Sequence, residues 1–303
     1  MPLKGRILFD QGHWEDPLAH LIKKLPEEGF LYEINTKLLT EDKLNQYTAL
    51  VLNNPKYEFS KDEIDIIKNY VNNDGGLLLT SSLKGEEDSN SSANEILKKF
   101  VDASFIFEDF QSNFSIIYYR SKSNSEKISG KIKVDYNISQ NHPTTRNVIN
   151  VIEGLNGLTY LLYHYKPNVI IKRSFSLESL TPDNFNYSKG IKIGDEIIEK
   201  PEDLKKILFP ITYNYHPINW NLARRDFLHE LNTCYSTLGI ARYVKRGSFV
   251  ALTGNLFDDD LIEKDVNKNA NLKLAINILE WLSQPTLHKV KVKTKIMPSY
   301  VHP

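Results

Sequence analysis

Cysteine is almost absent from this sequence, since its 303 residues include only Cys234. A single thiol excludes a disulfide within the chain and any metal site built from several cysteines. An excess of charge of either sign is also absent, because Lys plus Arg and Asp plus Glu number 38 each. No overall field therefore favours nucleic acid or an acidic membrane surface, and we expect neither as a partner.

Long apolar runs are missing as well. No stretch approaches the roughly 18 consecutive apolar residues of a membrane-spanning helix. The first residues, MPLKGR, lead straight into an expected strand and lack the apolar region of a signal peptide. With 41% hydrophobic and 25% charged residues, the composition is that of an ordinary globular protein. We therefore expect a cytoplasmic protein without a membrane segment.

The clearest fold signal is a strand–helix–strand pattern. Residues 49–52 and 77–79 are runs that are apolar throughout, as expected of parallel strands buried on both faces. Between them, Ser60 and Glu63 form a capping-box sequence, and an apolar stripe at helical spacing follows. We therefore predict that the two runs are adjacent parallel strands joined by a helix over residues 61–72.

Similar signals extend this pattern along the chain. Strands are expected at residues 5–10 and 30–34 with a helix between them, and paired strands at residues 235–243 and 247–252. Residues 84–94 contain almost no apolar side chains and are expected to form a loop, and a helix is expected over residues 92–100. Alternating strands and helices predict a doubly wound α/β fold.

We expect residues 1–284 to form a single α/β domain with a variable insertion near residues 175–235. Proline lacks an N–H and disfavours the helical conformation of the residue before it, so Gln284-Pro285 is expected to end the last helix. Residues 285–303 then form a basic tail in which lysines alternate with apolar residues. A period of two predicts an extended element, docked on its own domain or on a second chain.

Parallel sheets place ligands beyond the carboxyl ends of their strands. Polar residues follow three of the expected strands at that edge: Asp10, His13, Glu15, Asn53, Asn54, Ser81 and Ser82. The first three could form an acid/base or metal-binding group. Their loop alone offers no complete metal set, and the plainer interpretation is that Asp10 caps the loop while His13 is solvated.

Ser81 and Ser82 could act as nucleophiles only with a base nearby, such as His13 or His142. The plainer interpretation is that they start a polar loop and cap the next element. His142-Pro143 equally reads as a turn set by the fixed φ of proline. We therefore predict no catalytic residue, no metal and no cofactor, and keep all these strand-end residues and His142 as candidates for binding a ligand.

Four segments, in order, resemble a known family. They are ILFD at residues 7–10, FSKDEIDIIKNYVNNDGGLLLTSS at residues 59–82, NHPTTRNV at residues 141–148, and GSFVALTGNLFDDDLI with NLKLAINILEWL within residues 247–282. Together they resemble a glutamine-amidotransferase-like domain of the GIFT type. That domain forms the N-terminal part of an intraflagellar transport B-complex subunit and occurs in prokaryotic relatives of unknown function. The resemblance covers most of residues 5–284, with a poorly matched middle.

This resemblance implies a flavodoxin-like, mostly parallel sheet flanked by helices, with β-rich insertions. A class I glutamine amidotransferase places its nucleophilic cysteine at the turn after the strand that here ends in Thr80-Ser81-Ser82. It also places a histidine and a glutamate, two positions apart, on a later strand or loop. This sequence has serines at the turn, and no His-x-Glu pair follows them. The resemblance therefore implies a domain turned from catalysis to binding or scaffolding.

Two classes of function stay open. The first is a non-catalytic binding or scaffold protein, which acts through a protein partner or self-association. The alternative is a hydrolase or a protein that binds a small molecule, such as a sugar or nucleotide, around Asp10, His13 and Glu15. A ligand whose binding depends on His13 would favour the alternative.

Overall fold

The computed structural model divides the chain into two compact units. Unit 1 consists of Met1–Glu108, Ile138–Ile171 and Thr237–Pro303, and unit 2 of Asp109–Asn137 and Lys172–Ser236. The structure describes residues 2–13, 17–81, 87–108, 113–121, 124–151, 158–163, 168–181, 191–193, 196–198, 233–253, 256–264 and 270–295. Most of the insertion expected near residues 175–235 lies outside these described residues.

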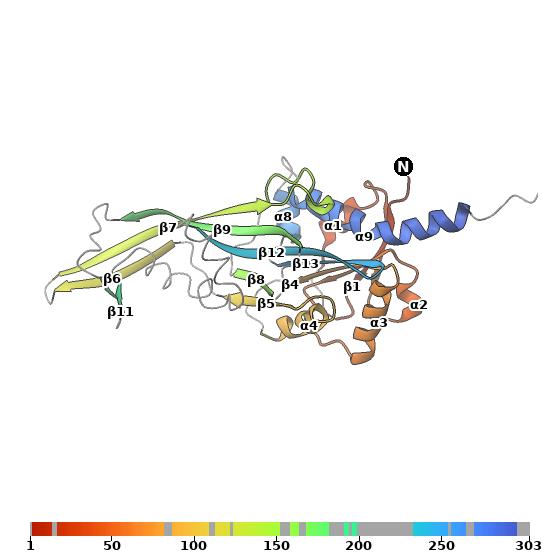
Figure 1. Cartoon of the computed structure of the whole chain (residues 1–303), viewed down its shortest axis with the longest axis horizontal. Helices are drawn as coiled ribbons and strands as arrows, with labels where there is room; N and C mark the ends of the chain where they lie inside the picture. Colours follow the sequence, from red (N-terminus) through yellow and green to blue (C-terminus); the bar gives the residue numbers. More distant parts are fainter. Residues whose placement is uncertain are drawn as a thin grey trace, which may run out of the picture. The chain divides into compact units, whose positions relative to one another are not determined.

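Unit 1 is built on a mostly parallel sheet (Figure 1). Its strands lie side by side in the order β2-β1-β3-β4-β13-β12, and the first five are mutually parallel while β12 runs antiparallel to β13. The strands are β1 (Gly5–Asp10), β2 (Phe30–Asn35), β3 (Ala49–Asn53), β4 (Gly76–Ser81), β12 (Thr233–Val244) and β13 (Gly247–Thr253). A mixed α/β fold is therefore confirmed.

The strand–helix–strand unit predicted from the sequence is present. Strands β3 and β4 pair in parallel, with Leu50 opposite Leu77. The connecting helix α3 (Lys61–Asn72) begins with a capping box, in which the Ser60 side chain accepts from the Glu63 N–H and the Glu63 carboxylate accepts from the Ser60 N–H. These reciprocal bonds satisfy two backbone donors that a helix start otherwise leaves open, so they fix where the helix begins.

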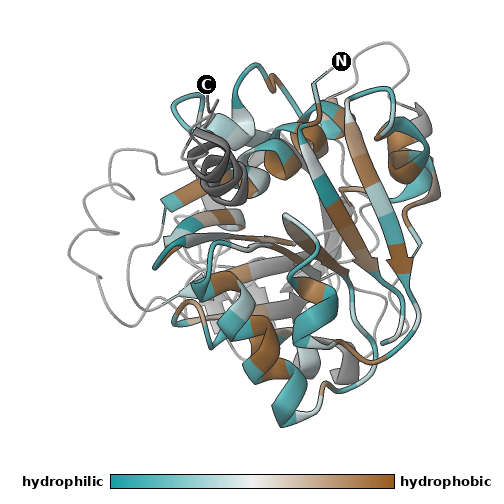
Figure 2. Cartoon of the chain, turned by 90° about the vertical axis from the view of Figure 1, so that its right-hand side faces the viewer, coloured by the Kyte–Doolittle hydropathy of each residue, from teal (hydrophilic) through white to brown (hydrophobic). Residues whose placement is uncertain are grey.

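Helices cover both faces of the sheet, as Figure 1 shows. One layer contains α2 (Glu41–Leu44), α3 and α4 (Glu87–Leu97), whose buried side chains join those of the strands in one core. The other contains α1 (Ala19–Lys24), α8 (Asp259–Lys264) and α9 (Ala270–Lys295). Figure 2 shows apolar residues along the strands between these layers and hydrophilic ones on the outer helix surfaces. Burial from both sides explains why the central strands are apolar throughout.

Shorter elements complete the described chain. In unit 1, β5 (Ala103–Glu108) pairs antiparallel with β8 (Leu158–Tyr163), and the 3₁₀ helix η1 (Pro143–Thr145) packs against α9. In unit 2, β6 (Asn113–Ser121) pairs antiparallel with β7 (Asn124–Ile138), and β10 (Ile191–Ile193) with β11 (Glu196–Ile198). Strand β9 (Asn168–Thr181) runs from unit 1 into unit 2.

The loop prediction was wrong for residues 87–91, because α4 begins at Glu87 and so starts before the helix expected from residue 92. Serine, asparagine and aspartate are weak helix formers, but Ala93, Ile96 and Leu97 are fully buried in the core. Most helical stability in proteins comes from such packing and not from intrinsic propensity.

The last helix also differs from its prediction, because α9 continues through Pro285 to Lys295 where an extended segment was expected. A proline inside a helix removes one hydrogen bond, here the one to the Trp281 carbonyl, at a cost of about 3 kcal/mol. Extending an existing helix needs no new nucleation step, so the helix can continue beyond the proline. Residues 296–303 lie outside the described part. No helix described in the structure is long and apolar enough to cross a membrane.

Candidate functional site

The strand order of unit 1 reverses between β1 and β3. From β1 the chain moves outward to β2, and it then returns to the other side of β1 to form β3. In open parallel sheets the crevice beyond the carboxyl ends of two such strands is where ligands bind. Asp10 is the last residue of β1 and Asn53 the last of β3, so two of the predicted site residues flank this point.

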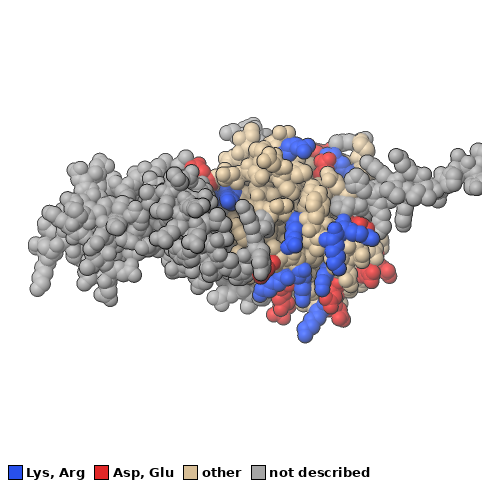
Figure 3. Space-filling model, in the orientation of Figure 1, with Lys and Arg blue, Asp and Glu red and all other residues tan. Residues whose placement is uncertain are grey.

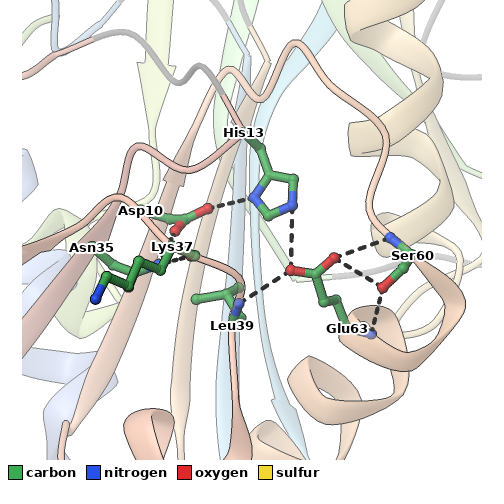
Figure 4. A network of polar contacts seen from close by, with 7 residues as sticks. All are labelled: Asp10, His13, Asn35, Lys37, Leu39, Ser60 and Glu63. Atoms are coloured by element: carbon green, nitrogen blue, oxygen red, sulfur yellow. Dashed lines mark hydrogen bonds and ion pairs between the residues drawn. The ribbon is translucent and has the colours of Figure 1, made fainter.

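A histidine between two carboxylates occupies this edge (Figure 4). The His13 Nδ1 lies 2.7 Å from the Asp10 Oδ2, and the His13 Nε2 lies 3.4 Å from the Glu63 Oε1. Asp10 comes from β1, His13 from the following loop, and Glu63 from the first turn of α3. The three side chains thus join elements that are some fifty positions apart in the sequence.

Each carboxylate has further partners. The Asn35 side-chain amide donates to the Asp10 Oδ1 at 2.6 Å, and it also donates to the Lys37 carbonyl. The Glu63 Oε1 accepts from the Leu39 N–H at 3.1 Å, and the Glu63 Oε2 accepts from the Ser60 hydroxyl at 2.9 Å. The network therefore ties β1, the segment after β2 and the start of α3 together.

The His13 side chain is enclosed. Only 4% of the residue is exposed, and its ring stacks on Phe59 with 3.7 Å between ring centroids. The His13 carbonyl accepts from the N–H groups of Lys56 and Tyr57 at 3.0 and 3.2 Å. A Cβ at Gly12 would lie 2.9 Å from the Lys37 carbonyl oxygen, so only glycine lets the loop approach this closely. The interpretation of His13 as a solvated loop residue is therefore wrong.

The electrostatics of the cluster favour a charged imidazolium. Burial by itself would lower the pKa of His13, but the hydrogen bond and the charge of Asp10, together with Glu63, outweigh it and raise the pKa above the ordinary 6.5. Burial raises the pKa of Glu63, yet hydrogen bonds from Leu39 and Ser60 and the charge of His13 bring it below its ordinary 4.5.

This geometry limits what the cluster can do chemically. Both ring nitrogens of His13 face carboxylate oxygens of the same chain, so neither offers a free lone pair to a metal ion or to a substrate proton. Within the described ranges, no three His, Cys, Asp or Glu side chains are arranged to hold a metal ion. We call Asp10, His13 and Glu63 the latch, because their contacts join the end of β1 and the loop after it to the start of α3. Glu15 lies outside the described residues.

The residues after β3 and β4 are also engaged with each other. The Thr80 hydroxyl donates to the Asn53 Oδ1 at 2.7 Å and accepts from the Asn54 N–H at 3.1 Å. Asn54 has a φ of 57°, a left-handed conformation that asparagine tolerates better than most residues. Ser81 is completely buried. A nucleophile must reach its substrate, so the buried Ser81 is poorly placed for that role, and Ser82 lies outside the described residues.

His142 belongs to a different part of unit 1. It caps η1, where its Nδ1 lies 2.7 Å from the Thr144 hydroxyl oxygen, and its ring meets that of Trp281 edge to face at 5.0 Å. Burial lowers the pKa of His142. These contacts fit the turn interpretation, because they hold η1 against α9.

Sequence reasoning missed Glu63 and Asn35 as members of the strand-end cluster. Glu63 carried a signal for a different role, as the third residue of a capping box, and it performs both roles at once. A capping glutamate on a helix that starts near the carboxyl ends of parallel strands is worth considering as a site residue. On the face that Figure 3 shows, basic and acidic side chains lie side by side over α2 and α3.

Comparison with known proteins gives one family match. A family model described as the IFT52 GIFT domain matches residues 10–139. No curated protein matches the chain. One similar solved structure is described as the mmIFT52 N-terminal domain, at 15% identity and a TM-score of 0.47, covering 92% of this chain and 97% of that one. Another is the cytoplasmic protein STM3548 from Salmonella typhimurium, at 12% identity and a TM-score of 0.45, covering 92% and 98%.

Proposed function

We propose that the protein is a non-catalytic binding or scaffold protein that acts through protein–protein contacts, and the match of residues 10–139 to the IFT52 GIFT domain model supports this. One observation carries the proposal: the polar side chains at the strand ends bind each other. Asp10, His13 and Glu63 form a closed latch, and Asn53 is bonded to Thr80. Catalytic sites need polar groups aimed at a substrate, and these are aimed at the protein itself.

The order of the strands supports a flavodoxin-like fold. The parallel strands follow the order β2-β1-β3-β4-β13, which corresponds to the flavodoxin-like order 2-1-3-4-5. We propose that the chain is a flavodoxin-like, glutamine-amidotransferase-like domain over residues 1–284. In that fold the nucleophile would lie at the turn after β4, where the sequence has Ser81 and Ser82. Without a cysteine no thioester can form, and a serine without an oriented base is a weak nucleophile.

The proposal includes a cytoplasmic location and a protein partner or self-association, with no nucleic acid or membrane as ligand. Acidic and basic residues are equal in number, so the chain has no excess positive charge to attract nucleic acid or an acidic membrane. The alternative function, a small-molecule binder or hydrolase around Asp10, His13 and Glu15, would need His13 to leave two carboxylates.

Two measurements on the full chain test the proposal. Ammonia release from glutamine should stay at the level of a protein-free control, and Ser81→Ala should behave identically. A thermal-shift screen with sugars and nucleotides should show no increase in melting temperature beyond that of a buffer control. Ammonia release that Ser81→Ala abolishes, or a saturable shift of several degrees with one ligand, would replace the scaffold proposal with the alternative.

A further inference from the structure

Strand β2 is the edge of the unit 1 sheet and carries an unusual set of exposed side chains. In the described part of the chain it pairs only with β1. Leu31, Tyr32 and Ile34 are 55%, 43% and 41% exposed, which places them among the few large apolar residues at the surface. Tyr32 and Ile34 lie on one face of the strand and Leu31 on the other, so both faces of this edge carry exposed apolar side chains.

The free edge of β2 follows from its hydrogen bonds to β1. The Gly29 carbonyl accepts from the Lys4 N–H at 2.8 Å, and the Asn35 carbonyl accepts from the Gln11 N–H at 2.7 Å. The backbone N–H and C=O groups of successive residues point alternately to the two edges of a strand. Those of the odd-numbered residues of β2 point toward β1, so those of the even-numbered residues point outward. The outward set is Phe30, Tyr32 and Ile34, of which the Phe30 N–H already donates to the Leu25 carbonyl at 3.0 Å.

Strand β2 lacks two of the residue types that usually prevent an edge strand from pairing with another chain. Natural edge strands are protected by lysine, proline, bulges or covering elements. Strand β2, FLYEIN, contains no lysine and no proline, and its single charge is Glu33. That carboxylate already has partners within the chain, because it accepts hydrogen bonds from the Lys43 ammonium group and from the Tyr47 hydroxyl.

The sequence of β2 can pair with itself in an antiparallel register that uses its outward backbone groups. With Tyr32 on a two-fold axis, Phe30 of one copy lies opposite Ile34 of the other, and Leu31 lies opposite Glu33. The outward groups then match: the two Tyr32 residues exchange both backbone bonds, and each Ile34 N–H reaches the other copy's Phe30 carbonyl. An axis through Glu33 instead would place two carboxylates opposite each other, which is destabilising.

We propose that β2 pairs with β2 of a second copy of this chain, across a two-fold axis at Tyr32, so that two sheets become continuous. This inference rests on the proposed function and specifies the partner and the surface. A second copy supplies matching outward backbone groups, and in this register it places the apolar Leu31, and not a like charge, opposite Glu33. Such an interface is isologous, the commonest form of homodimer contact.

A cysteine cross-link tests the register. In a Cys234→Ser background, Tyr32→Cys places two thiols on the axis, where Cα atoms of a bonded antiparallel pair lie about 5.5 Å apart, within disulfide range. Leu31→Cys is the matched control, since its two copies would lie about 8 Å apart, beyond that range. Mild oxidation should convert most of the Tyr32→Cys protein to a covalent dimer and leave Leu31→Cys without a covalent cross-link. Equal cross-linking of both variants, or of neither, would overturn the proposal.

Sedimentation of uncross-linked protein tests the same edge independently. Tyr32→Pro removes an outward N–H that β1 does not use, and proline is tolerated on that side of an edge strand. Ile34→Lys adds a like charge to each copy, and Ile149→Lys, at a residue 92% exposed, is the matched control. The unaltered chain and Ile149→Lys should sediment as dimers, and the two β2 variants as folded monomers with native circular dichroism. A monomeric unaltered chain, or β2 variants that stay dimeric, would refute the pairing while leaving the non-catalytic function standing.

Discussion

Replacing His13 with alanine should destabilise the protein by about 3 kcal/mol. Removing one partner of a buried ion pair costs about 3–5 kcal/mol, because the remaining charge stays buried without compensation. Here two carboxylates, Asp10 and Glu63, lose the cation between them, and Phe59 loses its stacked ring. We expect the lower end of the range because Asn35 still donates to Asp10, and the other hydrogen bonds of Glu63 also remain.

The effect should depend on pH in a defined direction. The pKa of His13 is raised on folding, so its stabilisation is complete below about pH 6.5 and fades as the pH rises through the folded value. The pKa of Glu63 is lowered, so its stabilisation is complete above about pH 4.5 and fades as the pH falls through the folded value. The latch therefore stabilises the fold most between these two values.

Urea unfolding at pH 6 and pH 8.5 measures both effects. The unaltered protein should lose stability between the two pH values, and His13→Ala should lose less, because the titrating group is gone. His20→Ala is the control, since that side chain is 43% exposed and lies 3.5 Å from the Asp259 carboxylate, a surface contact worth about 0–1 kcal/mol. A His13→Ala protein within about 1 kcal/mol of the unaltered one, or with the same pH dependence, would refute the latch.

Two further changes test the scaffold around the site. Ser60→Ala removes the N-cap of α3 and one partner of Glu63, and should cost about 0.5–2 kcal/mol in urea unfolding, whereas an unchanged midpoint would show that the cap is dispensable. Gly247→Ala would drive a Cβ into the Val71 and Gly75 carbonyl oxygens and should cost about 1–3 kcal/mol or more, measured by thermal melting. Gly239→Ala, which meets mainly the flexible Leu252 side chain, should cost less, and the reverse order would contradict the packing argument.

Local signals in the sequence were enough to predict the centre of the fold. The capping box at Ser60 and the two apolar runs around it specify a strand, a helix and a strand, and such units are almost always parallel and right-handed. The paired strands β12 and β13 could also be predicted, because the sequence Lys245-Arg246-Gly247 separates two apolar segments. In the structure the chain turns there, with a φ of 51° at Lys245.

The candidate site was only half predictable, for a physical reason. Asp10 and Asn53 were found because the end of a strand can be read from the sequence. The burial of His13 could not be found, since it depends on Glu63 and Phe59, which come from segments distant in the sequence. The helical course of residues 87–91 depends on the burial of Ala93, Ile96 and Leu97, which no pattern within those residues reveals. The continuation of α9 through Pro285 runs against the local signal of the proline.

The pairing of β4 with β13 has a consequence for the synthesis of the chain. Ser248 pairs with Gly76, 172 positions earlier. At about 5–20 residues per second, a ribosome needs about 10–35 s to supply that partner. Throughout this interval Leu77, Leu78 and Leu79 lie on an open strand edge, where nascent chains can pair wrongly with one another. The yield of native protein in a cell should therefore depend on translation speed and on chaperones, even where the finished fold is stable.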